Sequence, residues 1–170
     1  MVAVVIDTNV IVIANVVDDD DRKNCRDLCI ERLNQIITQK EIIVIDDGWR
    51  ILTEYIDNTK PNTKKGFGDM FVKRLLQNQS NSSVCRIVQI SSVAGNGTEF
   101  NEFPDDPRLQ NFDPDDRKFI AVSIAYFNQY QENPSVLLAI DRGWLLFIDT
   151  LHNHGVKIEL ICEDDMHHIK

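Results

Sequence analysis

Three aspartates, Asp7, Asp46 and Asp141, each close a short apolar segment rich in Val and Ile. Carboxylates that meet at one place repel one another and raise each other's pKa unless cations or hydrogen-bond donors neutralise them. Their oxygen atoms are the ligands that hard divalent ions such as Mg²⁺ prefer. These residue types therefore predict an acidic, metal-binding site, provided that the fold brings them together.

The segments that end in these aspartates predict buried parallel strands. Residues 2–7, 42–46 and 136–141 are continuously apolar and too short for helices, and residues 157–162 and 84–90 are candidates for two further strands. Continuous apolarity indicates burial on both faces, as in a parallel sheet covered by helices. Ligands of open parallel sheets bind outside the carboxyl ends of the strands, where the aspartates stand.

Helical patterns alternate with these strands. Apolar residues between Cys25 and Ile37 recur at spacings of three and four, which predicts a helix of about five turns. Two further stripes belong to segment 47–58, with Trp49, Leu52 and Ile56, and to the segment after Asp116, with Phe119, Ile120, Ile124 and Phe127. We expect a single α/β domain over residues 1–170, with a central, mostly parallel sheet, right-handed crossovers and a long loop at 91–113.

The composition is that of an ordinary globular domain, with 43% hydrophobic and 26% charged residues. A formal net charge of −9 argues against a protein that coats duplex DNA by bulk charge, but not against a nuclease whose acids hold metal ions. The longest apolar stretch, residues 2–17, contains Asp7 and follows no basic residue, so it predicts neither a membrane span nor a signal peptide. A cytoplasmic protein without a membrane partner is expected.

Other metal-binding residue types predict no second site. The four cysteines form no CxxC pair, so we expect small buried hydrophobes in a reducing compartment rather than disulfides or a zinc knuckle. The acidic run 18–21 cannot converge on one ion and is interpreted as a solvated loop that caps the next helix. The histidines lack a third ligand at useful spacing. These residues are Cys25, Cys29, Cys85 and Cys162, and His152, His154, His167 and His168.

Two acids on helices could join the strand-end aspartates. Glu54 lies off the predicted apolar stripe, so it faces a cleft or bulk solvent. Asp116 lies in the first turn of its helix, after Asp113 at the N-cap, and such positions favour acids by roughly 0.3–1 kcal/mol even without a ligand. Asp46 and Asp47 are equally well placed to cap the helix that begins near residue 48.

Four segments resemble, in order, the acidic motifs of PIN-domain nucleases: VVIDTNVIV, IDDGWRILTEYI, FDPDDRKFIAVSIA and VLLAIDRGW. The resemblance extends over residues 4–161 and implies a PIN-like fold. The family's four acids match Asp7, Glu54, Asp116 and Asp141. The two polar residues that orient the first acid match Thr8 and Asn9. It also implies that Asp46 is a helix cap rather than a ligand.

The resemblance implies an endoribonuclease that hydrolyses RNA phosphodiesters with Mg²⁺ or Mn²⁺. Asp7 and Asp116 would be the main ligands, with Glu54 and Asp141 bound directly or through water. Many bacterial relatives are toxins of toxin–antitoxin pairs, which makes an antitoxin protein a candidate partner, and a homodimer is also open. Gly143 stands where related proteins often carry a second acid, so the number of metal ions stays open. The alternative is a non-catalytic PIN-like binding or scaffold protein with residual acids.

Basic residues are concentrated in one segment, 60–86, which holds six of them against one acid. We predict that this segment contacts the RNA phosphate backbone, with Trp49 or Phe67 as stacking platforms. A solvated helix face is the alternative. The predicted contacts are Lys64, Lys65, Lys73 and Arg74.

Two other functions fit the sequence less well. A phosphatase with Asp7 as nucleophile needs an acid two residues later, where Asn9 stands. A receiver-like signalling domain could use the pair Asp46 and Asp47, but no lysine closes a later strand as that function requires.

Overall fold

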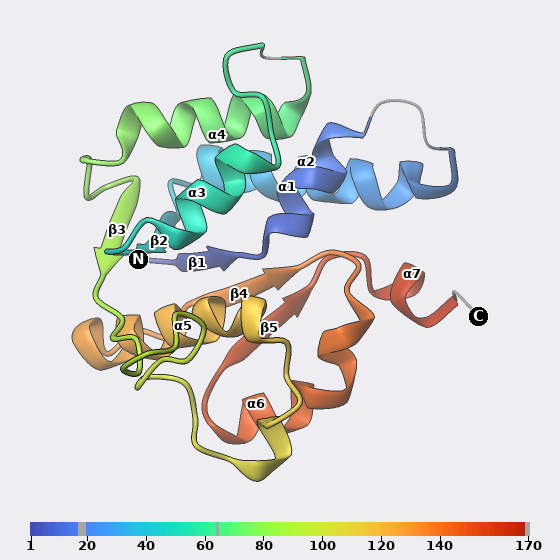
Figure 1. Cartoon of the computed structure of the whole chain (residues 1–170). Coiled ribbons are helices and arrows are strands. Elements are labelled where there is room, and N and C mark those ends of the chain that lie inside the picture. The colour runs from blue at the N-terminus through green and yellow to red at the C-terminus, as the bar shows by residue number, and fades with distance from the viewer. Residues whose placement is uncertain (17–19, 64, 169–170) are drawn as a thin grey trace.

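The computed structural model describes residues 1–16, 20–63 and 65–168, which form one five-stranded parallel sheet (Figure 1). This confirms the predicted α/β class and each of the five predicted strands. The spatial order is β3-β2-β1-β4-β5. The strands are β1 (Ala3–Ile6), β2 (Ile42–Asp46), β3 (Cys85–Val88), β4 (Ser135–Leu138) and β5 (Lys157–Leu160).

The strand order changes direction at β1. From β1 the chain passes outward to β2 and then β3, and it returns across the sheet to β4 and β5 on the other side of β1. The neighbouring strands β1 and β4 therefore flank the topological switch point. Ligands of such sheets bind outside the carboxyl ends of the strands at this point.

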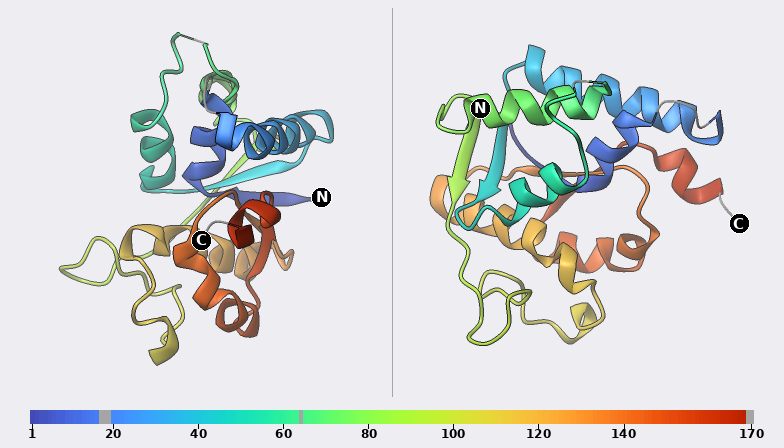
Figure 2. Two further views of the ribbon diagram at one scale, coloured as in Figure 1. Left: turned by 90° about the vertical axis from the view of Figure 1, so that its right-hand side faces the viewer. Right: turned by 45° about the horizontal axis from the view of Figure 1, so that its top comes forward.

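Helices cover both faces of the sheet (Figures 1 and 2). Two helices follow β1 and two follow β2 on one face, because both crossovers move outward in the same direction with the same hand. The opposite direction of travel puts α5 and α6 on the other face. The helices are α1 (Thr8–Asn15), α2 (Lys23–Thr38), α3 (Arg50–Asp57), α4 (Phe67–Asn78), α5 (Arg117–Tyr130), α6 (Ile148–Asn153) and α7 (Glu163–His168).

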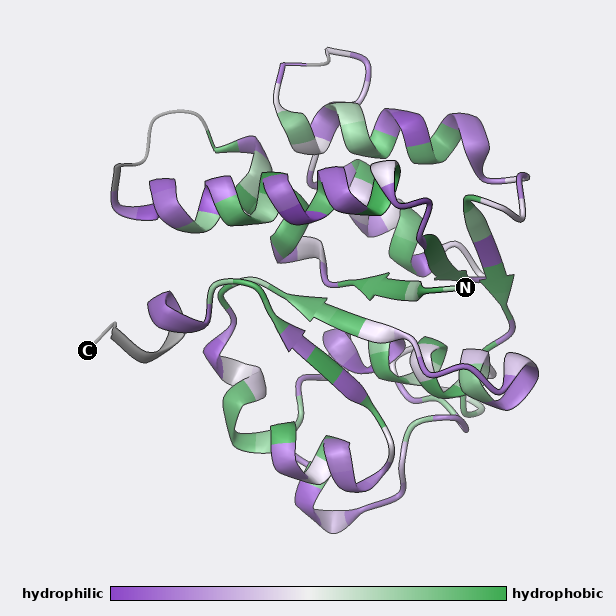
Figure 3. Ribbon diagram, turned by 180° about the vertical axis from the view of Figure 1, so that it is seen from behind, coloured by the Kyte–Doolittle hydropathy of each residue, from purple (hydrophilic) through white to green (hydrophobic). Residues whose placement is uncertain are grey.

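The core lies on both sides of the central strands. Every residue of β1, β2 and β4 is buried, whereas the edge strand β5 is mostly half-buried. Figure 3 shows the resulting contrast between hydrophobic central strands and helices with hydrophilic positions along their length. In the described parts of the chain, no helix is both long and apolar enough to cross a membrane.

The apolar face predicted for segment 47–58 is wrong. Trp49 and Ile56 are 41% and 40% exposed. Trp49 has a left-handed backbone conformation (φ 60°) and precedes the helix, which begins at Arg50, so the stripe that includes Trp49 does not exist. The buried face of α3 consists of Ile51, Leu52 and Tyr55.

The cysteine prediction is half right. Cys29 and Cys85 are free and buried, as expected. Cys25 and Cys162 form a disulfide, with their Cα atoms 5.3 Å apart and 137 residues between them in sequence. Spacing along the chain could not predict this bond because it depends on α2 passing beside the end of β5.

Two lesser predictions concern the regions that flank the core. Asp18, Asp19 and Lys64 lie outside the described residues. The N-cap residue of α2 is Arg22, which makes no side-chain capping hydrogen bond, rather than a member of the acidic run. The segment 91–113 is a long loop with one short 3-10 helix, Pro107–Leu109.

Candidate active site

Asp7 lies where β1 ends and α1 begins. Its side chain caps α1 by accepting a hydrogen bond from the backbone N–H of Asn9 at 3.3 Å. The residue is only 2% exposed. Burial raises the pKa of this carboxyl group well above its usual value, and the charges of Asp116 and Asp141 raise it further. Asp7 is therefore a buried acid in a negative environment, held by one long hydrogen bond.

Asp116 reaches the same place from the other face of the sheet, at the N-cap of α5. Burial, followed by the charges of Asp141 and Asp113, raises its pKa to about 7. The indole Nε1–H of Trp144 donates a hydrogen bond of 3.1 Å to Asp116 Oδ2. Because Trp144 is buried, this contact fixes the direction of the carboxylate.

Asp141 does not end a strand as predicted, because β4 stops at Leu138. It lies three residues later, at the N-cap of the 3-10 helix Arg142–Phe147, and accepts a hydrogen bond from the backbone N–H of Gly143 at 2.9 Å. Its pKa is raised by burial and by the charge of Asp113. A Cβ atom at Gly143 would lie 3.1 Å from Asp141 Oδ1, so the glycine allows this close turn.

Glu54, on α3, is held by two neighbours. Its Oε1 accepts a 2.7 Å hydrogen bond from the Thr8 hydroxyl, and its Oε2 forms a 2.5 Å ion pair with Lys118. Lys118 is 8% exposed and also donates to the backbone oxygen of Asp115. Lys118 is thus a buried cation inside an otherwise acidic group.

The structure places the four sequence-predicted acids in one electrostatic group. The charges of Asp116, Asp141 and Glu54 all raise the pKa of Asp7. Three further residues that contact or act on these acids are not predicted as site residues from the sequence. Asp113 was recognised from the sequence only as a helix cap, and no signal in the sequence distinguished Lys118 or Trp144 from other helix residues. We refer below to Asp7, Glu54, Asp113, Asp116 and Asp141 as the acidic group.

The acids of this group are near one another but are not drawn into a tight cluster. Among the described residues, the only three His, Cys, Asp or Glu ligand atoms that all lie within 4.8 Å of one another belong to Cys25, Cys29 and Cys162. Hard carboxylate donors in a buried negative site suit Mg²⁺ or Mn²⁺. Because Mg²⁺ keeps several of its water molecules, it can bind some acids of a wider group through water.

Of the two residues predicted to orient Asp7, Asn9 contacts it and Thr8 does not. Thr8 orients Glu54 rather than Asp7, because its hydroxyl donates to Glu54. Asn9 holds Asp7 through its backbone N–H, which any residue except proline could supply.

Asp46 is not part of the acidic group. Its Oδ1 accepts from the backbone N–H of Ile51 at 2.9 Å, and its Oδ2 accepts from the backbone and side chain of Arg50, each at 3.1 Å. This confirms that Asp46 caps α3. Asp47 instead accepts from the backbone N–H of Ile90, so it does not share that role.

The predicted RNA contacts separate into two places. Lys65 is exposed and precedes Gly66, whose backbone lies against Asn15 at the end of α1. Lys73 donates to Asn62 at 3.3 Å. Arg74 lines a cavity of about 270 Å³ together with residues that precede or begin β2 and β3, such as Ile43 and Val84, so it lies near the amino ends of the strands, away from the acidic group.

A larger cavity, of about 570 Å³, lies along the loop 91–113 and includes Arg117, the residue that follows Asp116. None of the five acids lines it.

Comparisons with protein-family models, with curated proteins and with solved structures give no match to this chain.

Proposed function

We propose that this chain is a divalent-metal-dependent endoribonuclease of PIN-like type. The observation that supports it best is the convergence of Asp7, directly after β1, and Asp141, in the turn after β4, with Asp116 from α5, in surroundings that raise the pKa of all three. Without a counterion this arrangement is unfavourable, which is typical of a site that binds a cation. The strand order also suits a PIN-like fold.

Asp7 and Asp116 would be the main metal ligands, and Glu54 and Asp141 would bind directly or through water. A bound Mg²⁺ or Mn²⁺ supplies a water of lowered pKa and stabilises the negative charge that develops on the phosphate. Trp144 holds the direction of Asp116, and the Gly143 N–H holds Asp141. Thr8 and Lys118 hold Glu54, so each proposed ligand has a supporting donor.

The test is cleavage of single-stranded RNA by the purified chain with Mg²⁺, with Mn²⁺ and with a chelator. Asp116→Asn should lower the rate by about 10²- to 10³-fold, which corresponds to several kcal/mol of lost transition-state stabilisation. Asp115→Asn is the matched control, since it removes the same charge from the exposed neighbouring residue. Metal-independent cleavage, or equal rates in the two variants, would refute the proposal.

A non-catalytic PIN-like binding protein is the second candidate, favoured by the ion pair between Lys118 and Glu54. An ammonium group beside the acids can supply the positive charge that a metal would bring. In that case Mg²⁺ leaves the melting temperature unchanged at pH 8. A ribonuclease whose folded state binds the ion is stabilised by it, so its melting temperature rises.

The biological setting follows the proposed chemistry. As an endoribonuclease, the chain would act on cellular RNA in the cytoplasm, and as a toxin it would have an antitoxin protein as partner. Expression of the chain in growing cells tests this. Growth arrest by the wild-type chain, but not by Asp116→Asn, would support a toxin.

A further inference from the structure

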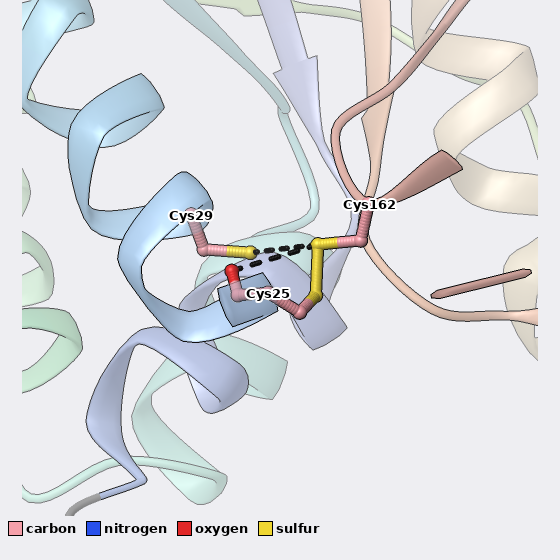
Figure 4. The surroundings of a disulfide bond; sticks show 3 residues. All are labelled: Cys25, Cys29 and Cys162. Carbon is pink, nitrogen blue, oxygen red and sulfur yellow. Dashed lines mark hydrogen bonds between the residues drawn. A yellow bond between two sulfur atoms is a disulfide. The ribbon is translucent and has the colours of Figure 1, made fainter. Parts of the chain in front are cut away.

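A second group of metal-binding residues lies apart from the acidic group. Cys25 and Cys29 are one turn apart on α2, and Cys162 follows the end of β5. Their three sulfur atoms converge in the buried contact between α2 and that end of the sheet (Figure 4). All three residues are fully buried, with exposed fractions of 0–1%.

The spacing of these sulfur atoms is that of a thiolate metal site. Cys29 Sγ lies 3.8 Å from Cys162 Sγ. A tetrahedral zinc site with Zn–S bonds of about 2.3 Å has sulfur–sulfur edges of about 3.8 Å. Cys25, now bonded to Cys162, meets the third corner once that bond is reduced, since its ligand atom already lies within 4.8 Å of the other two.

A neighbouring acid could supply the fourth corner by a change of side-chain rotamer, since its ligand atom is not among those that lie within 4.8 Å of one another. Asp165, on α7 one turn after Cys162, has a buried Oδ2 atom with no hydrogen-bond partner among the described residues. Burial, and then the charge of Asp165, raises the pKa of the Cys29 thiol to about 12. A buried carboxylate oxygen without a partner is unfavourable unless a cation or a donor meets it.

We propose that Cys25, Cys29, Cys162 and Asp165 form a site for one thiophilic divalent cation, of which Zn²⁺ is the best fit, in the reduced chain. Two molecules of a low-molecular-weight thiol reduce the Cys25–Cys162 disulfide to two cysteine thiols and are themselves oxidised to their disulfide. The three cysteines then bind Zn²⁺ as thiolates and release three protons. The oxidised chain has one free thiol here, so disulfide and metal exclude each other.

The site would attach the C-terminal helix α7 to α2 in reducing conditions, as the disulfide does in oxidising ones. The ligands come from residues 25–29 and 162–165, so either link closes nearly the whole chain. This inference does not depend on the ribonuclease proposal, because no residue of the acidic group takes part.

The experiment titrates the full-length, metal-free chain with Co²⁺ after reduction with a phosphine, and then displaces the Co²⁺ with Zn²⁺. Thiolate-to-cobalt charge-transfer absorption reports this site alone, because carboxylates do not produce it. The titration uses Asp7→Asn as the background, which removes a main ligand of the acidic group. We expect one equivalent of Co²⁺ per chain, full displacement by Zn²⁺, and no such absorption before reduction.

Two variants and a control complete the test. Cys29→Ser should weaken binding by at least about 100-fold, the upper range for loss of a residue that only hydrogen-bonds to a ligand. Asp165→Asn, at a half-buried position, should keep the charge-transfer band and weaken binding at least about tenfold. Cys85→Ser changes the other buried free cysteine and should have no effect.

The proposal is overturned if the reduced chain, folded by circular dichroism, shows no thiolate-to-cobalt absorption, or if Cys29→Ser binds as tightly as Cys85→Ser. Should reduction unfold the chain, recovery of the native spectrum on adding Zn²⁺ supports the site, and failure to recover overturns it. Unchanged affinity in Asp165→Asn overturns the assignment of the fourth ligand.

Discussion

Asp7 and Asp46 occupy equivalent places in neighbouring parallel strands, yet their surroundings are opposite. Both follow the apolar part of a central strand, both precede a helix, and both are at most 2% exposed. Asp46 accepts two backbone N–H groups and pairs with Arg50. Asp7 accepts one N–H at 3.3 Å and lies among other acids.

The difference follows from the strand order. The crossover helices that follow β1 and β2 lie on the same face of the sheet, and α3 starts next to Asp46, so the first N–H groups of α3 are available to that carboxylate. Asp7 lies at the switch point, where the chain segments diverge and the acids of α5 and of the turn after β4 enter instead. A carboxylate whose two oxygens accept hydrogen bonds from the protein stabilises the fold, whereas a carboxylate with few donors is available to a ligand.

The most direct test of this difference between Asp7 and Asp46 is to neutralise each aspartate in turn. Asp7→Asn should reduce RNA cleavage by about 10³-fold, since it removes a ligand oxygen without changing the size of the side chain. Asp46→Asn should keep the rate within about threefold, measured per folded molecule, because Asp46 touches no member of the acidic group. Single-turnover cleavage rates measure both, and a similar loss in both variants would contradict the distinction between ligand and cap.

Stability should respond in the opposite sense. Asp46→Asn breaks the ion pair with Arg50 and replaces a doubly accepting carboxylate, at a cost of about 2 kcal/mol. For a chain of this size we expect the melting temperature to fall by about 4–8 °C. Asp7→Asn removes a charge that its surroundings oppose, so it should leave stability unchanged or higher. Urea denaturation checks both, and a larger loss in Asp7→Asn would show that the hydrogen bond from Asn9 outweighs the repulsion.

The metal-free chain should lose stability as the pH rises. The pKa of Asp116 is about 7 in the folded state, above the usual value of about 3.9 for an unfolded chain. Between these values the folded state binds more protons than the unfolded state, so the free energy of unfolding decreases as pH rises from about 4 to about 7. The cost is absent below pH 4 and complete above pH 7. The difference of about three pKa units corresponds to about 4 kcal/mol, which solvent screening at this half-buried residue reduces to about 2 kcal/mol.

Asp116→Asn should flatten this pH dependence, and Asp115→Asn should not. Saturating Mg²⁺ at pH 8 should restore the stability that the wild type loses and leave Asp116→Asn unaffected. Urea melts at pH 4.5 and pH 8 with a chelator test this. If the free energy of unfolding of the wild type, relative to that of Asp116→Asn, rises between these pH values, neighbouring donors neutralise the carboxylate and the prediction is wrong.

These contrasts also mark what the sequence could and could not predict. The apolar strands and the alternation of strand and helix predicted the fold class, because burial on two faces leaves a pattern in consecutive residues. The four acids were found through the motif pattern. Lys118, Trp144 and Asp113 were not, because their roles arise from contacts between elements far apart in the chain. The same limit hid the Cys25–Cys162 disulfide.

The smallest expected effect concerns RNA contacts outside the acidic group, and it compares Lys65 with Arg74. Lys65 lies beside the end of α1, which is about 11 Å along the helix from Thr8, whereas Arg74 lies near the amino ends of the strands. We expect an RNA strand bound at the acidic group to reach Lys65 by a shorter path than Arg74.

Lys65→Ala should therefore weaken RNA binding about threefold and reduce the slope of log affinity against log salt by about 0.7, the value for one phosphate contact on a single strand. Arg74→Ala removes the same charge and should change neither quantity. Binding is measured in the Asp7→Asn background so that the RNA stays intact. Equal effects of the two variants would mean that the basic segment attracts RNA only through its overall charge, and the predicted difference between Lys65 and Arg74 would be wrong.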